Sequence, residues 1–361
     1  MFALVRAIVG AASRAGELRD RVRRVREDAL SHMEEYLRSF RECLEASGGC
    51  VHEAGTGADA LRLLDRIVGE SEAVKSKTSV GKEVGVRGTE TDTGDFIAAL
   101  LGDSGHPILP AIDKTPEEIA EALKKHYGID VSPNPADIVS AVRNILRRKI
   151  LSAGVGITGA NVLTADGEIV VVENEGNIAL VSHVPEVHVV VTSIEKVVSD
   201  VFAALHVCRA LALFGTGQRF PTYVSIISGP SGTADIGGRL VRPAQGPGEL
   251  HVVLVDNGRR ALLGSEYRDV LRCINCGACI SVCPVFHAVG KAYGLDHRGA
   301  RGILLQRFQR SLGEIFEKAF YCAGCGLCRE VCPAGVAPQD LEHVVGDDSE
   351  GLGNVVDVFK S

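Results

Sequence analysis

The stretch Cys273-Ile-Asn-Cys276-Gly-Ala-Cys279-Ile-Ser-Val-Cys283-Pro284 decides the organisation of this chain. Its spacing returns further along as Cys322-Ala-Gly-Cys325-Gly-Leu-Cys328-Arg-Glu-Val-Cys332-Pro333. Both runs follow the pattern C-x2-C-x2-C-x3-C-P, with which bacterial-type ferredoxins hold 4Fe–4S clusters. Three closely spaced thiolates can wrap one cubane from a single loop. The fourth cysteine lies beyond its reach and ligates the cluster of the other run.

This crossed pattern predicts two 4Fe–4S clusters together with their ligands. One cluster is assigned to Cys273, Cys276, Cys279 and Cys332, and the other to Cys322, Cys325, Cys328 and Cys283. Zinc fits poorly, because its four ligands usually come as two pairs rather than as two identical quartets followed by proline. Disulfides would need an oxidising compartment, and the N-terminus does not have the form of a secretory signal.

The composition is that of an ordinary globular protein large enough for two domains. Of the 361 residues, 45% are hydrophobic and 24% are charged, and the formal net charge is −7. This negative charge gives no general attraction to nucleic acid or to an anionic membrane, so neither is an expected partner. No apolar run reaches the length of a transmembrane helix. Exposed clusters and free thiols at Cys43, Cys50 and Cys208 indicate a reducing cytoplasm.

The N-terminal part of the chain alternates helices with short strand candidates. Residues 17–45 have an apolar stripe at helical spacing, which predicts one long charged helix. Strand candidates such as Cys50–Glu53 alternate with helices such as Ala58–Val68 and Gly94–Leu101. The segments Thr115-Pro116-Glu117-Glu118 and Asn134-Pro135-Ala136-Asp137 are typical helix starts. Such alternation predicts an α/β domain with a largely parallel sheet.

Residues 155–263 are richer in strands, with a hairpin turn at Ala165-Asp166-Gly167 and a helix over Ile194–Phe214. The expected strands are Val155–Thr164, Glu168–Val172, Val187–Thr192, Tyr223–Ile227 and Leu250–Val255. From about Ser265 onward the strand pattern stops, and residues 298–308 and 312–320 have helical periodicity. We therefore expect a helical arm at 1–48, an α/β domain at 49–264, a helical dicluster ferredoxin domain at 265–347 and a flexible tail at 348–361.

One glycine motif resembles a nucleotide-binding loop but has the wrong context. Gly154-Val-Gly156-Ile-Thr-Gly159 matches G-x-G-x-x-G, which binds a dinucleotide only where it follows a strand and opens a helix. Here it follows a predicted helix and leads into a predicted strand. We therefore do not expect NAD or FAD at this motif.

Polar, glycine-bearing loops at strand ends are better candidates for a small-anion site, because open α/β sheets place ligands there. These loops are 173–177, 228–235 and 245–248. The candidate substrate-binding residues are Thr158, Asn161, Asn174, Gly176, Asn177, Ser231, Thr233 and Asp235. The alternative is that these residues only form turns and helix caps, for which Asn, Asp, Ser and Gly are equally suited. Residue chemistry alone leaves both interpretations open.

Several longer runs resemble a known family. NEGNIALVSHVPEVHVVVTSIEKVV (174–198), TYVSIISGPSGTADI (222–236) and GPGELHVVLVDNGR (246–259), followed by the first cysteine run, are similar to the iron–sulfur subunit of the lactate-utilisation system. This is a LUD-domain family, known as lactate utilisation protein B. The resemblance implies a three-layer α/β domain shared with sugar-phosphate isomerases and CoA transferases. An α-helical ferredoxin domain is expected to follow it.

The chain departs from the family pattern at three places. Gly237 stands where the family commonly has Glu after Asp-Ile, and Gln245 stands where a His precedes Gly-Pro. These changes remove a carboxylate and an imidazole from the implied pocket. The chain also ends soon after the second cysteine run, so we expect a contact with partner subunits to be missing or rebuilt.

The resemblance implies an electron-transfer subunit of an L-lactate dehydrogenase-type complex that oxidises lactate, or another small 2-hydroxy acid, to the 2-oxo acid. No flavin or nicotinamide motif is visible, so the centre that splits the electron pair is expected on a partner. The implied partners are a second LUD-domain protein and a cysteine-rich protein of the heterodisulfide-reductase type. Two alternatives remain. The LUD domain acts on a small acid or acyl-thioester with Glu173 or Glu175 as nucleophile or base, or the chain is a metabolite or redox sensor.

Overall fold

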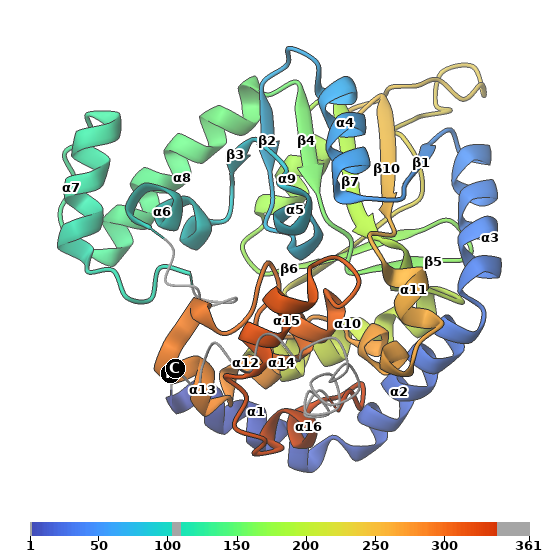
Figure 1. The fold of residues 1–361 in the computed structure, drawn as a ribbon. Coiled ribbons are helices and arrows are strands. Elements are labelled where there is room, and N and C mark those ends of the chain that lie inside the picture. The colour runs from blue at the N-terminus through green and yellow to red at the C-terminus, as the bar shows by residue number, and fades with distance from the viewer. Residues whose placement is uncertain (1, 103–109, 338–361) are drawn as a thin grey trace.

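The computed structural model describes residues 2–102 and 110–337. Its central element is a six-stranded sheet in the order β1-β10-β7-β4-β2-β3, in which every neighbouring pair is parallel (Figure 1). The strands are β1 Cys50–Ala54, β10 Glu249–Val255, β7 Val187–Ser193, β4 Val155–Thr158, β2 Ala73–Lys75 and β3 Thr89–Glu90. The prediction of a largely parallel sheet is confirmed.

A second, four-stranded sheet lies beside the parallel one, in the order β8-β5-β6-β9. Its strands are β8 Val197–Val198, β5 Val162–Thr164, β6 Ile169–Glu173 and β9 Tyr223–Ile227. β6 is antiparallel to both β5 and β9. The single strand predicted over 155–164 is therefore wrong, because the chain leaves the parallel sheet after Thr158 and enters the second sheet at Val162. The predicted hairpin turn at 165–167 is present between β5 and β6.

The parallel sheet is buried on both faces, which makes three layers. Successive side chains of a strand point to opposite faces, and β7 illustrates this. Val190 packs with α3 (Met33–Ala46) and the second sheet, whereas Val189 and Val191 pack with α4 (Gly57–Val68) and α5 (Ser79–Val84). The expected layered α/β architecture is confirmed.

Three further helices form a separate apolar cluster near the β3 edge (Figure 1). They are α6 Thr93–Leu101, α7 Pro116–Tyr127 and α8 Pro135–Ser152. Both helix starts read from the sequence are present: Thr115 and Glu118 form a capping box on α7, and Asn134 accepts a hydrogen bond from the Ala136 N–H on α8. The capping residues in the sequence therefore predicted the starts of α7 and α8 correctly.

The prediction of one long helix over 17–45 is wrong, because this segment forms two helices, α2 Gly16–Ser31 and α3 Met33–Ala46. The break at His32, with φ −117° and ψ 18°, turns their apolar faces toward different cores. The helix predicted over 194–214 also differs. Ile194–Lys196 is a 3-10 turn, β8 follows, and α10 (Val201–Thr216) begins only after Asp200, whose carboxylate caps the Phe202 and Ala203 N–H groups. Asp200 was the overlooked helix-start signal.

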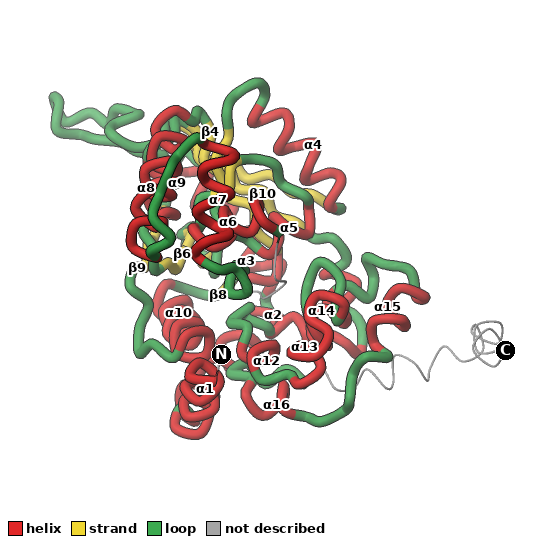
Figure 2. The backbone as a smooth tube through the Cα atoms, turned by 90° about the vertical axis from the view of Figure 1, so that its left-hand side faces the viewer, coloured by secondary structure: helices red, strands yellow, loops and turns green. Residues whose placement is uncertain are grey.

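The described residues after β10 form only helices and loops. Residues 265–337, here called the helical module, contain α12 Ala278–Ser281, α13 Pro284–Val289, α14 Gly299–Leu305, α15 Leu312–Ala319 and α16 Leu327–Val331. These helices gather with α1 (Phe2–Arg14), α2 and α10 beyond one end of the sheets (Figure 2), where they share one apolar core. The predicted end of this domain at 338–347 and the predicted tail at 348–361 lie outside the described residues. Nowhere in the described chain is a helix both long and apolar enough to cross a membrane.

Candidate iron–sulfur site

The first group of cysteines combines both runs. Cys273, Cys276 and Cys279 lie around the start of α12 and Cys332 follows α16, and all four line one cavity of about 320 Å³. Burial raises the pKa of Cys276 well above its usual range, and the neighbouring Cys332 and Cys279 raise it further. Burial also raises the pKa of Cys279 to about 12. Bound iron must therefore displace protons from these thiols, so cluster assembly releases protons.

The second group lines a smaller cavity of about 30 Å³. Its members are Cys283 from the first run and Cys322, Cys325 and Cys328 from the second. Burial raises the pKa of Cys328 to about 11, with Cys322, Cys283 and Cys325 adding to the effect. The structure thus brings the cysteines into the two sets that the crossed spacing predicts, while the iron ligation of each residue stays a prediction.

The loops around both groups suit a cubane bound by thiolates. Gly277 and Gly326 have φ angles of 78° and 75°, and Asn275 has a φ of 60°, left-handed conformations that let the chain wrap tightly. Backbone N–H groups of Asn275 and Val336 point at the sulfurs of Cys273 and Cys332, each at 3.3 Å. Such bonds stabilise thiolate sulfur. In the described residues, no group of three or more His, Cys, Asp or Glu is arranged to hold a single metal ion.

The two cavities adjoin each other. Cys279, Cys328 and Arg301 line both of them. The positive charge of Arg301 acts against the rise in the pKa of Cys279. At the second cavity, burial raises the pKa of the Tyr293 hydroxyl, and the neighbouring Cys322 raises it further. Charges and hydrogen bonds around the sulfurs set the potential of an iron–sulfur cluster.

The larger cavity extends from the first cysteine group to the carboxyl edge of the parallel sheet. Ser76 and Thr78 follow β2, Asn161 follows β4, and Lys196 lies beyond the end of β7; all four line the cavity. Burial lowers the pKa of Lys196 to about 8, and its ammonium donates a hydrogen bond to the Ala160 carbonyl at 2.8 Å. The sequence prediction missed Ser76, Thr78 and Lys196, because β2 has only three residues and no glycine pattern marks its end.

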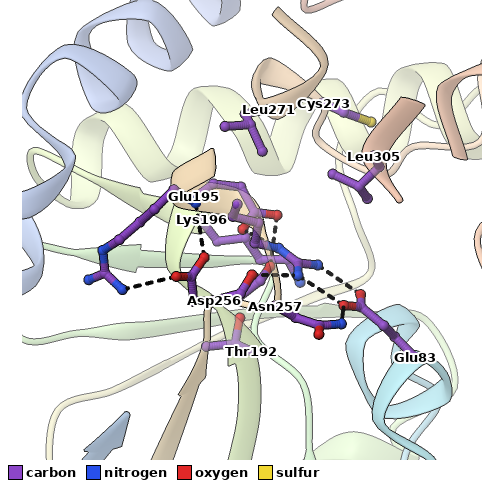
Figure 3. A network of polar contacts seen from close by, with 12 residues as sticks. Glu83, Thr192, Glu195, Lys196, Asp256, Asn257, Leu271, Cys273 and Leu305 are labelled. Carbon is purple, nitrogen blue, oxygen red and sulfur yellow. Dashed lines mark hydrogen bonds and ion pairs between the residues drawn. The ribbon is translucent and has the colours of Figure 1, made fainter. Parts of the chain in front are cut away.

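A buried ionic network joins the sheets to the helical module (Figure 3). Arg259 lies between Glu83 and Glu195, at N–O distances of 2.8 Å to each carboxylate. His297 of the helical module contacts the same Glu83 carboxylate at 2.7 Å. Arg26 of α2 donates to the carbonyls of Glu195 and Leu271 at 2.5 and 2.8 Å, just before the first cluster cysteine. The network therefore fixes the cysteine loop relative to the sheet edge.

The loop after β6 uses its predicted site residues mainly for internal contacts. Both carboxylate oxygens of the buried Glu173 accept N–H bonds from α9 (Asn177–His183), at 2.7 and 2.9 Å, so this side chain is a helix cap. Glu175 accepts hydrogen bonds from Thr93, and Asn174 accepts from Thr222. Gly176 has a φ of 82° at the start of α9, and Asn177 donates to Thr91. Glu175, Gly176 and Asn177 line a separate, open cavity with Arg143 and Arg147.

The remaining candidates are dispersed. Thr158 is fully buried and shares a 2.8 Å hydrogen bond with His188, while Asn161 accepts the Val172 N–H at 2.8 Å and lines the larger cavity. Ser231, Thr233 and Asp235 lie in the loop after β9, together with Gly237 and Gln245. The loops after β6 and β9 lie at opposite ends of the second sheet, because these two strands pair antiparallel. The substrate-binding role of these residues stays a prediction. The motif at 154–159 precedes and contains β4, so its predicted reversed context is confirmed.

Comparison with known proteins places the chain in a family. The model of the LUD domain matches residues 37–255, which is more than half of the chain. The chain belongs to the LUD-domain family. A model described as a 4Fe-4S dicluster domain matches residues 269–336, the stretch that contains all eight cysteines of the two runs. The prediction that this LUD protein carries two 4Fe–4S clusters is thereby confirmed.

Among curated relatives, the LUD protein is 36% identical over 302 residues to "Lactate utilization protein B" of Bacillus pumilus, covering 78% of this chain and 61% of the relative. It is 35% identical over 305 residues to the "Uncharacterized electron transport protein YkgF" of Escherichia coli, covering 80% and 62%. The chain thus spans about three fifths of the length of these relatives. A crystal structure of a DUF162 family protein from Deinococcus radiodurans aligns at 16% identity with a TM-score of 0.33, covering 62% of this chain and 98% of that one.

Proposed function

We propose that this LUD protein is the iron–sulfur electron-transfer subunit of a complex that oxidises lactate, or a closely related 2-hydroxy acid, to the 2-oxo acid. The observation that carries the proposal is the adjacency of the two cysteine-lined cavities, which have Cys279 and Cys328 in common. Two clusters held there would be close neighbours, so single electrons would pass between them over a short path. The name of the relatives and the dicluster domain matched in this chain support the same role.

Oxidation of a 2-hydroxy acid removes two electrons, whereas each cluster passes one electron at a time. A centre that accepts the pair and releases single electrons is therefore required, and we place it on a partner. The proposed partners are a second LUD-domain protein and a cysteine-rich protein of the heterodisulfide-reductase type. Exposed clusters and free thiols suit a reducing compartment such as the cytoplasm.

We expect electrons to leave this chain from the second cluster rather than from the first. Cys325 is exposed, and the apolar side chains of Phe320, Tyr321 and Leu327, next to the second group in sequence, are 81%, 39% and 39% exposed. Exposed aromatic and aliphatic side chains of this kind are typical of protein contact surfaces. We expect Phe320→Glu to slow electron transfer to the acceptor protein at unchanged iron content. Phe202→Glu, at a phenylalanine of α10 that is 74% exposed, should leave it unchanged.

Cluster reduction by lactate tests the role of the chain. The protein is prepared anaerobically with both clusters, mixed with L-lactate, and followed by the loss of visible absorbance and by electron paramagnetic resonance. We expect reduction only when the partner proteins are added, because the pair-splitting centre lies on them. Prompt reduction of the isolated chain by lactate, or no reduction in the complete complex, would contradict the proposal.

A further inference from the structure

The larger cavity has more room than a cluster alone explains. Five cysteines border each cavity, with Cys279 and Cys328 common to both, and one cluster of the same kind belongs to each, yet the volumes are about 320 Å³ and about 30 Å³. The additional space lies toward the parallel sheet, where residues 76–79, 159–161 and 196 form the wall. This wall contributes no cysteine, so the cluster ligands do not account for its polar character.

The wall lies at the position where the topology of the sheet reverses. From β2 the chain moves outward to β3, whereas from β4 it continues in the opposite direction to β7. In open α/β sheets, ligands bind outside the carboxyl ends of the strands at such a switch point. Ser76 and Thr78 follow β2, and Asn161 follows β4, so they flank the crevice on its two sides.

Two hydroxyl groups at this wall have no hydrogen-bond partner among residues 2–102 and 110–337. Ser76 is only 1% exposed, and among the described residues its Oγ has no hydrogen-bond partner. Thr78 occupies the N-cap of α5 without capping it, and its buried Oγ1 likewise has no partner in the described chain. Buried polar groups are nearly always hydrogen-bonded. Two orphaned hydroxyls on one cavity wall therefore indicate a ligand that supplies the missing partners.

A positive charge is available beside these hydroxyls. Lys196 donates to the Ala160 carbonyl, but an ammonium group has three donors, so two remain for a ligand. Glu195, its neighbour in sequence, is already held by Arg259 at 2.8 Å and by the Ser193 hydroxyl at 2.8 Å. Lys77 and Lys82 also line the cavity, but both are paired with Asp95, at 2.7 and 3.1 Å. Lys196 is thus well placed to meet a single negative charge.

We propose that this cavity binds a small monocarboxylate of the 2-hydroxy or 2-oxo acid class, with Lys196 and the hydroxyls of Ser76 and Thr78 as its binding groups, on the sheet side of the first cluster. One ammonium matches one carboxylate, and each protein hydroxyl can both donate to a carboxylate and accept from a ligand hydroxyl. The proposal deepens the proposed function and rests on it for the substrate class. It concerns binding only, and electron transfer from the ligand still needs the centre on the partner.

Calorimetry on the anaerobically prepared chain with both clusters tests the site, with L-lactate, pyruvate and inorganic phosphate as titrants. We expect lactate and pyruvate to bind with one site and phosphate not to bind. Pyruvate should also change the paramagnetic resonance signal of the reduced first cluster. Absence of lactate and pyruvate binding, or equal binding of phosphate, overturns the proposal. Electron relay in the complete complex would survive either result, so the two failures are distinguishable.

Hydroxyl deletions give the sharper test because these groups make no hydrogen bond within the described part of the protein. We expect Ser76→Ala and the isosteric Thr78→Val each to weaken lactate binding about tenfold or more, the loss of one hydrogen bond to a charged group. The melting temperature without ligand should stay the same or rise, since an unsatisfied buried group is removed. Ser132→Ala, at an exposed serine outside the cavity, is the matched control and should bind like the wild type. Wild-type binding in both cavity variants overturns the assignment.

Discussion

The guanidinium of Arg259 donates to both oxygens of Glu83, at 2.9 and 2.8 Å, and both side chains are 1% exposed. Burial alone would lower the pKa of Arg259, but the carboxylates of Glu195 and Glu83 raise it overall. His297 contacts the same Glu83 from the helical module, so this buried pair fixes the cluster region to the sheet domain. Its integrity therefore matters for folding and for the geometry of the larger cavity.

Arg259→Met is expected to be severely destabilising. The change leaves the Glu83 and Glu195 carboxylates buried without their main counter-ion, a situation that costs about 3–5 kcal/mol of unfolding free energy. Denaturant unfolding under anaerobic conditions measures the loss. Lys124→Met is the control, because its partner Asp130 is 82% exposed and such pairs contribute about 0–1 kcal/mol. Similar losses in both variants would contradict the importance of the buried network.

His188 is expected to make the protein sensitive to acid. Burial lowers the pKa of His188 to about 3, with His183 adding to the effect. The unfolded chain takes up this proton below about pH 6.5, whereas the folded chain does not, so protons favour unfolding. The contribution of His188 is complete above about pH 6.5 and is lost as the pH falls, by about 2 kcal/mol between pH 7 and pH 5.

Unfolding free energies measured at pH 7 and pH 5 test this expectation. In His188→Gln, which keeps a polar group near Thr158, the difference between the two pH values should shrink by about 2 kcal/mol. His126→Gln, at an exposed histidine on α7, should retain the wild-type difference. An unchanged pH dependence in His188→Gln would show that other groups dominate the acid response.

Iron content tests the crossed ligation. Cys332 is the last cysteine of the second run but lines the first cavity. Cys332→Ala should therefore lose the first cluster and leave about four of about eight irons. Cys283→Ala should lose the second cluster instead. Cys208→Ala, at a buried cysteine of α10 outside both cavities, should keep all iron. If Cys332→Ala lost the signal of the second cluster, the crossed assignment would be wrong.

The features that we predicted correctly from the sequence are local ones. The spacing of the eight cysteines, the caps at Thr115 and Asn134, and the strand pattern depend on residues close together in the chain. The helix break at His32 was missed because it serves two different cores that only the folded chain contains. The relative position of the loops after β6 and β9 could not be predicted, because the composition of a strand does not reveal whether it pairs parallel or antiparallel.

The buried ionic network and the wall of the larger cavity could not be predicted from the sequence, for a related reason. Glu83, Arg259 and His297 are far apart in the sequence and meet only once α5, α11 (Arg259–Leu263) and the helical module are packed. Ser76 and Thr78 look like ordinary loop residues in the sequence. Their significance is that they are buried and unpartnered, and burial is a property of the fold rather than of the residue type.

Tyr293 is expected to raise the reduction potential of the second cluster. Tyr293 is 1% exposed and lines the second cavity, where Cys322 adds to the rise that burial causes in the pKa of the Tyr293 hydroxyl. We therefore expect this hydroxyl to donate a hydrogen bond to a sulfur of the bound cluster. A donor to sulfur stabilises the more negative, reduced cluster, so its removal in Tyr293→Phe should lower the potential. One hydrogen bond of about 0.5–1.5 kcal/mol corresponds to roughly 20–60 mV for a single electron.

A redox titration followed by paramagnetic resonance measures this shift for each cluster. Tyr321→Phe is the matched control, because its ring lies 6.4 Å from that of Tyr293 and is 39% exposed, so it removes a hydroxyl near the same cluster from a wetter position. We expect a smaller shift in Tyr321→Phe and none in the first cluster of either variant. An unchanged potential of the second cluster in Tyr293→Phe would mean that the Tyr293 hydroxyl does not donate a hydrogen bond to the bound cluster.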